Sequence, residues 1–422
     1  MKFISTLLTL LFSFILQAQS FETYFKDETI RLDFVFQGNK NQTKTILNPL
    51  VSTGKWYGRK VNLDKNLLQG DAEIVVYGLK SKKVIYTQSF SSLYFEWLTQ
   101  QSANKEIFTQ EQVLYIPFPK EKFKVVLNKF EKNKPVKIYE QTFDLSNKNL
   151  IKVDNLEIKF KELHKATETY SPINVAIVAE GFTKEEMPIF ENYAQKTLNS
   201  LFNHKAFKNH KDKFNIYAVL AESKDSGVSS PSKSKNINTV AQSNFDTFGY
   251  ERYLTTSKVF KLHTELAGFW FDHIIIIANT NVYGGGGIYN AYTLTSIYDQ
   301  TFDAVVVHEF GHSFAGLADE YFYEDDIFSN TIPLDIEPWN KNNTTLVNFD
   351  SKWKNKLAKD TPIPTDATLF KDDRVGVYEG IKNGKIYIPH QNCRMHTNEA
   401  HDFCSVCTDA IEELILFYTK QK

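Results

Sequence analysis

Cysteine is scarce in this chain of 422 residues, and an excess of charge of either sign is missing. The 49 basic residues are balanced by 50 acidic ones. Proteins that bind nucleic acid or anionic membranes carry a basic surplus, so neither class is expected. The three cysteines allow one disulfide at most. We expect Cys393 to pair with Cys404 or Cys407, with a metal held by the three thiols and His401 as the alternative.

Long hydrophobic runs are also missing, apart from a short one at the N-terminus. Met1-Lys2 precedes an apolar stretch over residues 3–16, and Ala18 supplies a small residue for cleavage. This pattern predicts a signal peptide over residues 1–18. The stretch is shorter than the roughly 20 residues of a membrane span, and no other candidate span exists. We therefore expect an exported protein, secreted, periplasmic or at the cell surface, with no transmembrane segment.

The region from residue 19 to 150 is predicted to be an N-terminal β-sandwich domain. Short stretches in it alternate apolar and polar residues between polar turns, which is typical of strands that bury one face. The clearest of them cover residues 30–36, 72–77, 122–127 and 137–143. No cluster of His, Cys or carboxylate residues occurs there. The polar segment 147–154 marks a domain boundary, and residues 151–422 form a second domain.

Strands and helices alternate in the second domain, which predicts an α/β fold. Apolar strands are expected at residues 173–178, 214–219 and 274–277. Thr183, with Glu186 three residues later, forms a capping-box signature at the start of a helix. The glycine run at 284–287 lacks the Lys-Ser/Thr of a phosphate loop. We expect residues 287–292 to form an exposed edge strand that could pair with an extended peptide, with a plain flexible hairpin as the alternative.

The motif His308-Glu309-Phe310-Gly311-His312 follows the apolar run 304–307 and carries the chemistry of the chain. Histidines four residues apart lie on one face of a helix, so both can bind one Zn²⁺. The carboxylate of Glu309 can then take a proton from a water molecule as that water attacks a carbonyl. The motif predicts a zinc-dependent hydrolase with Glu309 as the general base.

A catalytic zinc site needs a third protein ligand and an open position. Gly316 can end the helix in a left-handed conformation and turn the chain back, which favours Asp319, three residues later, as that ligand. Metzincin-type peptidases share this layout, although this chain has one more residue between the second histidine and the glycine. Glu320 and, in a gluzincin-like arrangement, Glu337 remain alternatives.

A methionine far downstream is the candidate floor of the zinc site. Metzincins place a methionine in a tight turn below their ligands. After the expected cleavage only Met187 and Met395 remain, and we expect Met187 to lie on a helix surface. Met395 is therefore predicted to form the turn. The position two residues on, a tyrosine in some metzincins, is Thr397, so His396 or His401 is the candidate partner for the oxyanion.

The motif from His308 to Tyr321, together with the segment Cys393-Arg394-Met395 and the C-terminal cysteine pair, resembles the IgA-peptidase family of secreted bacterial zinc metallopeptidases. The resemblance covers about residues 150–420, and the preceding segment is similar to the family's all-β N-terminal domain. It implies a metzincin-like α/β peptidase domain with a Met-turn, and zinc-dependent endopeptidase activity on protein substrates. Immunoglobulin is one candidate substrate, which membership alone does not imply.

Two other functions are consistent with the sequence. One is a non-catalytic surface protein that binds carbohydrate or protein and whose zinc site is structural, in which case a fourth protein ligand would close the site. The other is metal-dependent hydrolysis of a different bond, such as an amide in peptidoglycan. Glu309 in its motif position argues against a purely structural site, because such a site has no use for that carboxylate.

Overall fold

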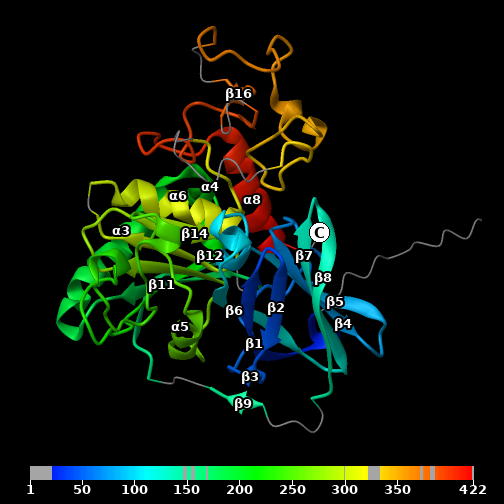
Figure 1. Ribbon diagram of the computed structural model, residues 1–422, viewed down its shortest axis with the longest axis vertical. Coiled ribbons are helices and arrows are strands. Elements are labelled where there is room, and N and C mark those ends of the chain that lie inside the picture. The colour runs from blue at the N-terminus through cyan, green and yellow to red at the C-terminus, as the bar shows by residue number, and fades with distance from the viewer. Residues whose placement is uncertain are drawn as a thin grey trace, which may run out of the picture.

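The computed structural model describes residues 21–145, 150–153, 157–167, 170–298, 300–321, 333–370, 374–380 and 385–420. The predicted signal peptide, residues 1–18, lies outside these ranges. Figure 1 shows an N-terminal part made mainly of strands, in blue and cyan, beside a larger part in green to red that contains the long helices. No helix among the described residues combines the length and the apolar character that crossing a bilayer requires.

Two antiparallel-rich sheets form the N-terminal part. The first contains β1 (Phe25–Asn39), β2 (Gln42–Leu47), β3 (Val51–Ser52), β6 (Phe108–Pro119) and β9 (Ile151–Lys152). The second has the order β5 (Lys83–Phe90), β4 (Ala72–Gly78), β7 (Phe123–Glu131) and β8 (Lys134–Phe143). One hydrophobic core draws on both sheets, with Phe34 and Leu114 from the first and Ile74 and Leu127 from the second. Alternating apolar residues thus meet between two sheets, the arrangement of a sandwich.

The first sheet extends slightly past the predicted domain boundary. β9 pairs in parallel with β3, with Val51 opposite Ile151 and Ser52 opposite Lys152. The N-terminal sheet therefore includes two residues beyond position 150. Short helices α1 (Phe21–Tyr24) and α2 (Leu93–Trp97) complete this part of the chain.

A six-stranded mixed sheet organises the second part. Its order is β10 (Phe160–His164), β12 (Phe214–Val219), β11 (Ile173–Glu180), β13 (His273–Ala278), β15 (Tyr292–Ser296) and β14 (Gly285–Ile288). The four central strands are parallel, and the two outer strands pair antiparallel. β11 and β13 are buried at every position, as expected for central parallel strands covered on both faces. A small separate hairpin pairs β16 (Tyr378–Glu379) with β17 (Tyr387–Ile388).

Helices cover both faces of this sheet. One core contains side chains of α3 (Met187–Asn203), α4 (Lys205–Lys208), α6 (Phe302–Ala315) and α8 (Ser405–Thr419). The core on the other face contains α5 (Val259–Glu265) and side chains of the N-terminal part. The predicted capping box of Thr183 and Glu186 is present before α3. Met187 is buried in the first core, so its expected place on a helix surface was wrong.

Short 3₁₀ turns connect the larger elements. They are η1 (Ser102–Asn104), η2 (Lys184–Glu186), η3 (Lys211–Lys213), η4 (Pro231–Lys233), η5 (Thr247–Gly249), η7 (Phe349–Ser351) and η8 (Lys354–Lys356).

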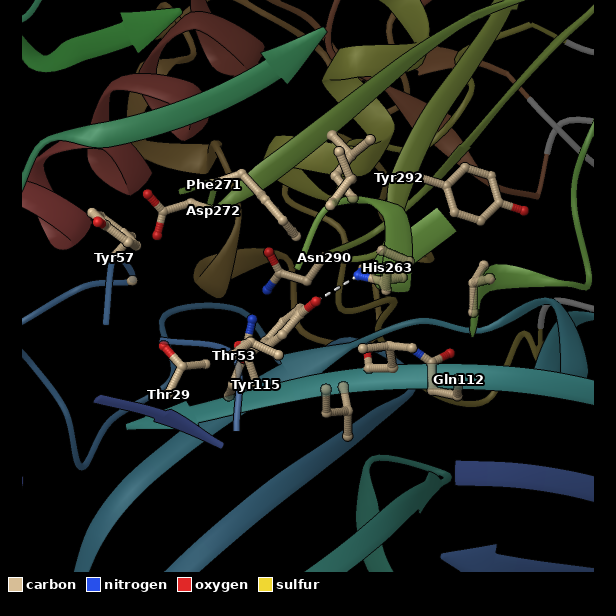
Figure 2. Close-up of a pocket in the computed structure, with 18 of the residues that line it drawn as sticks. Thr29, Thr53, Tyr57, Gln112, Tyr115, His263, Phe271, Asp272, Asn290 and Tyr292 are labelled. Carbon is tan, nitrogen blue, oxygen red and sulfur yellow. Dashed lines mark hydrogen bonds between the residues drawn. The ribbon is translucent and has the colours of Figure 1, made fainter. Parts of the chain in front are cut away.

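Polar contacts join the two parts closely. Asn62 donates from Nδ2 to the carbonyls of Phe417 and Lys420, both at 2.8 Å, so the end of α8 is fastened to the N-terminal part. Figure 2 shows a cavity between β6 and α5, where Tyr115 and His263 are joined by a hydrogen bond of 2.9 Å. This cavity has a volume of about 90 Å³, and none of its lining residues belongs to the His308 motif.

Candidate active site

Helix α6 carries the His308 motif and ends where the sequence predicts. Gly316 has φ +59° and ψ 28°, and its N–H donates to the carbonyls of Gly311 and His312. The left-handed residue ends the helix, and the chain returns along it toward His308. Glycines of β14 allow this strand to lie against α6. A methyl group on Gly287 would lie 2.2 Å from the Glu309 carbonyl oxygen, which only a glycine avoids.

Three side-chain atoms converge beside α6. His308 Nε2 lies 3.0 Å from His312 Nε2 and 3.0 Å from Asp319 Oδ1, and His312 Nε2 lies 3.2 Å from the same oxygen. Tetrahedral zinc with bonds of about 2.0–2.1 Å separates its nitrogen and oxygen ligands by about 3.3 Å. The nearly equal sides of this triangle therefore fit one shared cation. No other His, Cys, Asp or Glu of the described chain joins the group.

The hydrogen bond that each imidazole makes through Nδ1 determines which nitrogen carries a proton. His308 Nδ1 lies 3.0 Å from the Arg394 carbonyl oxygen, and His312 Nδ1 lies 2.6 Å from the Leu317 carbonyl oxygen. A carbonyl only accepts hydrogen bonds, so each Nδ1 carries a proton and each Nε2 is left to face Asp319 Oδ1. Two imidazole nitrogens and a carboxylate oxygen at these distances need positive charge between them, either as a proton on Nε2 or as a metal cation. The donor set thus suits a divalent metal.

The charges of the group agree with this geometry. Burial alone would lower the pKa of His312, but Asp319 and Glu309 raise it to about 9. Burial likewise opposes ionisation of Asp319, yet the two imidazoles hold the pKa of that carboxyl well below its ordinary value. Positive charge near Asp319 is therefore strongly favoured. Burial raises the pKa of Glu309, and the neighbouring imidazoles only partly offset this effect.

Glu309 stands next to this triangle but apart from it. Its side chain lies against β14, since a methyl group on Gly285 would lie 2.8 Å from Glu309 Oε1. The carboxylate is not a member of the three-atom group. A raised pKa and a position beside a potential cation are the properties of a group that exchanges protons.

The three candidates for the third ligand lie in different places. The structure brings Asp319 to the imidazoles. Glu320 turns toward the cysteines, and its Oε1 lies 3.1 Å from Cys407 Sγ. Glu337 accepts from the backbone N–H of Asn348 at 2.8 Å and lies 3.9 Å from Lys352 Nζ.

Met395 lies below the motif helix. A methyl group on Gly311 would lie 2.8 Å from Met395 Sδ, so the sulfur packs against the turn between the two histidines. Met395 is fully buried. Its carbonyl oxygen accepts from the Glu320 N–H at 2.9 Å, while the Arg394 carbonyl faces His308. The segment around Met395 therefore holds both the first histidine and the chain after Asp319.

A cleft of about 570 Å³ passes the triangle and runs between the two parts of the chain. His312 and Asp319 line it from one side, and Phe95, Glu96 and Lys132 line it from the N-terminal part. The cleft is large enough to hold several residues of an extended peptide. The N-terminal part thus forms one wall of the site.

Two cleft residues were not anticipated. Burial raises the pKa of Glu96 to about 7, although the Tyr253 hydroxyl donates to both its oxygens at 2.8 Å. Nothing in the sequence places this residue of α2 near α6. Tyr321 lines the cleft, with its ring centroid 5.8 Å from that of His308. Its position two residues after Asp319 could have drawn attention to it.

The predicted edge strand differs from expectation. The strand β14 spans Gly285–Ile288, and the following residues turn into β15. It is the outermost strand of the sheet, but Tyr253 forms a bridge to Gly285 and the Ser91 N–H donates to the Tyr289 carbonyl. The prediction of an edge strand is therefore confirmed, but the strand covers residues 285–288 rather than 287–292, and these contacts occupy part of its edge.

The expected disulfide is absent, because Cys393, Cys404 and Cys407 are all free and buried. Cys393 and Cys407 Sγ lie 3.7 Å apart, far beyond the 2.05 Å of a disulfide bond. His401 is exposed and does not join the cysteine group, whose fourth member is Glu320. Neither His396 nor His401 belongs to the lining of the cleft.

Two imidazoles and an acid that face one another, with a separate glutamate beside them and a peptide-sized cleft at His312 and Asp319, are the groups by which metallopeptidases are recognised. The model of the IgA Peptidase M64 family matches residues 161–374, and that of the Peptidase M64 N-terminus matches residues 20–140. The chain belongs to the IgA peptidase M64 family. It is therefore a peptidase of two-domain architecture. No curated protein matches the chain.

Proposed function

We propose that this chain is an exported, zinc-dependent endopeptidase whose metal is held by His308, His312 and Asp319. One observation supports the proposal most directly: the Nε2 atoms of His308 and His312 and Asp319 Oδ1 face one another within 3.2 Å. Family membership supports the peptidase activity. Zinc is commonly bound by two imidazoles and one carboxylate in peptidases, where the fourth coordination position stays open for water or substrate.

The remaining groups of the site have separate tasks. Zinc bound there acidifies water and polarises a carbonyl oxygen. Glu309 takes the proton of the attacking water and delivers it to the departing amine nitrogen, a role that its raised pKa supports. Tyr321, beside His308 in the cleft, donates a hydrogen bond to the oxyanion.

The scaffold agrees with a metzincin-like arrangement in which Met395 forms the floor. The sulfur packs below Gly311, between the two histidines of α6. We propose that the two domains meet near residue 150. Because β9 pairs with β3, the boundary is placed after Lys152. The apolar segment 3–16 supports export.

A purely structural zinc at this site has less support. A closed site takes a fourth protein ligand, and within the described residues the group contains three. The cleft beside the group also gives a peptide access to it. We therefore favour catalysis over a non-catalytic binding function.

The replacement Glu309→Gln tests the assignment, with Glu185→Gln as an exposed control on the same chain. We expect the Glu309 variant to retain its zinc and to lose peptide hydrolysis by at least about 100-fold. Zinc is measured by mass spectrometry, and hydrolysis with casein and with IgA as separate substrates. Turnover equal to that of the control would rule out Glu309 as the base. Cleavage of casein but not IgA would leave the peptidase assignment intact and exclude immunoglobulin as a substrate.

A further inference from the structure

A second group of metal-binding side chains lies behind the candidate active site. Cys393, Cys404, Cys407 and Glu320 each point one ligand atom at the same place, and these atoms all lie within 4.8 Å of one another. All four residues are buried. The group shares no residue with the triangle of His308, His312 and Asp319.

The distances fit a zinc ion that is coordinated tetrahedrally by sulfur ligands. Zinc–sulfur bonds of about 2.3 Å place two thiolates about 3.8 Å apart. Cys393 Sγ and Cys407 Sγ lie 3.7 Å apart, and Cys407 Sγ lies 3.1 Å from Glu320 Oε1. Cys404 and Cys407 have the two-residue separation of a zinc-binding Cys-x-x-Cys pair.

An unsatisfied carboxylate oxygen points independently to a ligand. Glu320 has no exposed surface. Its Oε1 accepts from Asn342 Nδ2 at 2.9 Å, but no hydrogen-bond donor of the described chain reaches Oε2. A buried carboxylate oxygen without a partner is costly, and a cation held by the three thiols would compensate it.

The surrounding backbone favours negative charge on these ligands. Cys404 is the N-cap of α8, and Cys407 lies in its first turn. The N-terminal end of a helix carries partial positive charge. The Cys404 N–H also donates to Cys393 Sγ at 3.3 Å. The helix end and this N–H therefore partly offset the burial that disfavours negative charge on the thiols.

We propose that Cys393, Cys404, Cys407 and Glu320 hold a second zinc ion with a structural role. Four protein ligands close the coordination shell and leave no place for a substrate, as in structural zinc sites. Soft thiolate ligands select zinc over the calcium and magnesium that prefer oxygen.

The position of this ion would couple it to the active site. Glu320 follows Asp319 directly, and Cys393 precedes Arg394, whose carbonyl orients His308. The Glu320 N–H also donates to the Met395 carbonyl. The second zinc would thus hold the segment around Glu320 against the segment around Cys393, and both segments contribute to the first site. Its loss is expected to weaken the first site as well, by displacing Asp319.

The test measures zinc per chain in the full-length exported protein. We expect two zinc ions in the parent protein, and one in the double variant His308→Ala, His312→Ala. That remaining ion, replaced by Co²⁺, should give the near-ultraviolet charge-transfer band of a thiolate ligand. A further Cys404→Ser change removes one of three thiolates and should weaken the band or, if the ion is lost, abolish it, whereas Ser405→Ala, in the same turn of α8, should keep it at full intensity. Because the spectrum is recorded in protein whose active-site histidines are gone, failure of the catalytic proposal would not affect it.

Two measurements keep the proposal falsifiable if Cys404→Ser does not fold. Denatured parent protein, with chelator and without reductant, should show three reactive thiols, whereas a single thiol would mean a disulfide and overturn the proposal. Glu320→Cys should retain two zinc ions, while Glu320→Ala should release one at least about tenfold faster to a chelator. Parent protein with one zinc and no thiolate band would also overturn it.

Discussion

Asp319 and Glu320 are neighbours in the chain, yet their carboxylates serve different groups. Asp319 faces two imidazoles, whereas Glu320 faces three cysteines. Spacing from the motif favoured Asp319 but did not separate it from Glu320 or the distant Glu337. The separation depends on the return of the chain after Gly316 and on the Met395 carbonyl that holds the Glu320 N–H. Such contacts between remote segments cannot be derived from spacing.

Asp319→Asn should release the active-site metal. The amide keeps the shape of the side chain but removes the negative charge that faces both Nε2 atoms. Zinc affinity is expected to fall by more than the 10–100-fold effect of removing an outer-shell partner. Competition with a fluorescent chelator measures it. Asp335→Asn is the control, since Asp335 is exposed and pairs with Lys132. Equal affinity in both variants would exclude Asp319 as a ligand.

Tyr321→Phe should slow the chemical step without releasing zinc. The change removes only the hydroxyl, while the ring beside His308 remains. Loss of one oxyanion donor costs about 100–1,000-fold in kcat. We expect a fall toward that range with KM nearly unchanged, measured by steady-state hydrolysis of a peptide. An altered KM with unchanged kcat would instead assign Tyr321 to substrate binding.

At the scale of elements, hydrophobic periodicity located most of the predicted strands. The apolar runs at 214–219 and 274–277 correspond to β12 and β13, because a strand buried on both faces has to be apolar throughout. The glycine run was less informative. Its glycines form β14 and leave room for α6 to pack closely against that strand. This requirement arises from packing between distant elements, so it produces no periodic pattern in the sequence.

Gly287→Ala should separate β14 from α6. The added methyl group would lie 2.2 Å from the Glu309 backbone, which cannot move without displacing the motif. We expect a loss of about 1–3 kcal/mol in the free energy of unfolding together with reduced hydrolysis. Gly311→Ala is the comparison, because its methyl group meets side chains, Met395 Sδ and the Phe403 ring, rather than backbone, and alanine favours the helix by about 1 kcal/mol. Chemical denaturation should therefore rank Gly287→Ala as the less stable variant.

At the scale of the whole molecule, the sequence predicted two domains and the motif of the active site. It did not predict that Glu96 and Lys132 of the N-terminal part line the cleft. Nor did it predict Glu320 as the fourth member of the cysteine group, for which His401 was the nearest candidate in sequence. Both features depend on how distant elements pack, and that packing is decided by the complete set of contacts between the two parts.

Acid should weaken the interface between the two parts. Burial, with Arg31 adding to it, lowers the pKa of His263 from its ordinary value of 6.5 to about 3. The unfolded chain therefore takes up a proton first, and stability present above pH 6.5 is lost as the pH falls from 6.5 toward 3. Between pH 7.5 and 5.5 the loss should be about 1.4 kcal/mol.

His263→Gln keeps a polar partner for Tyr115 but does not titrate. The difference in unfolding free energy between parent and variant should therefore shift by the same amount, in favour of the variant, between the two pH values. Parallel pH profiles for the two proteins would contradict this role of His263.

The last thirty residues, from Cys393 onward, complete both candidate metal centres and fasten α8 to the first domain. A ribosome makes these residues after the His308 motif. A partly synthesised chain therefore has the His308 motif but lacks the Arg394 carbonyl and all three thiols. Proteolytic competence should consequently appear only after the segment from Cys393 to the end of α8 has been made and folded, which would help to protect the cell that makes the enzyme.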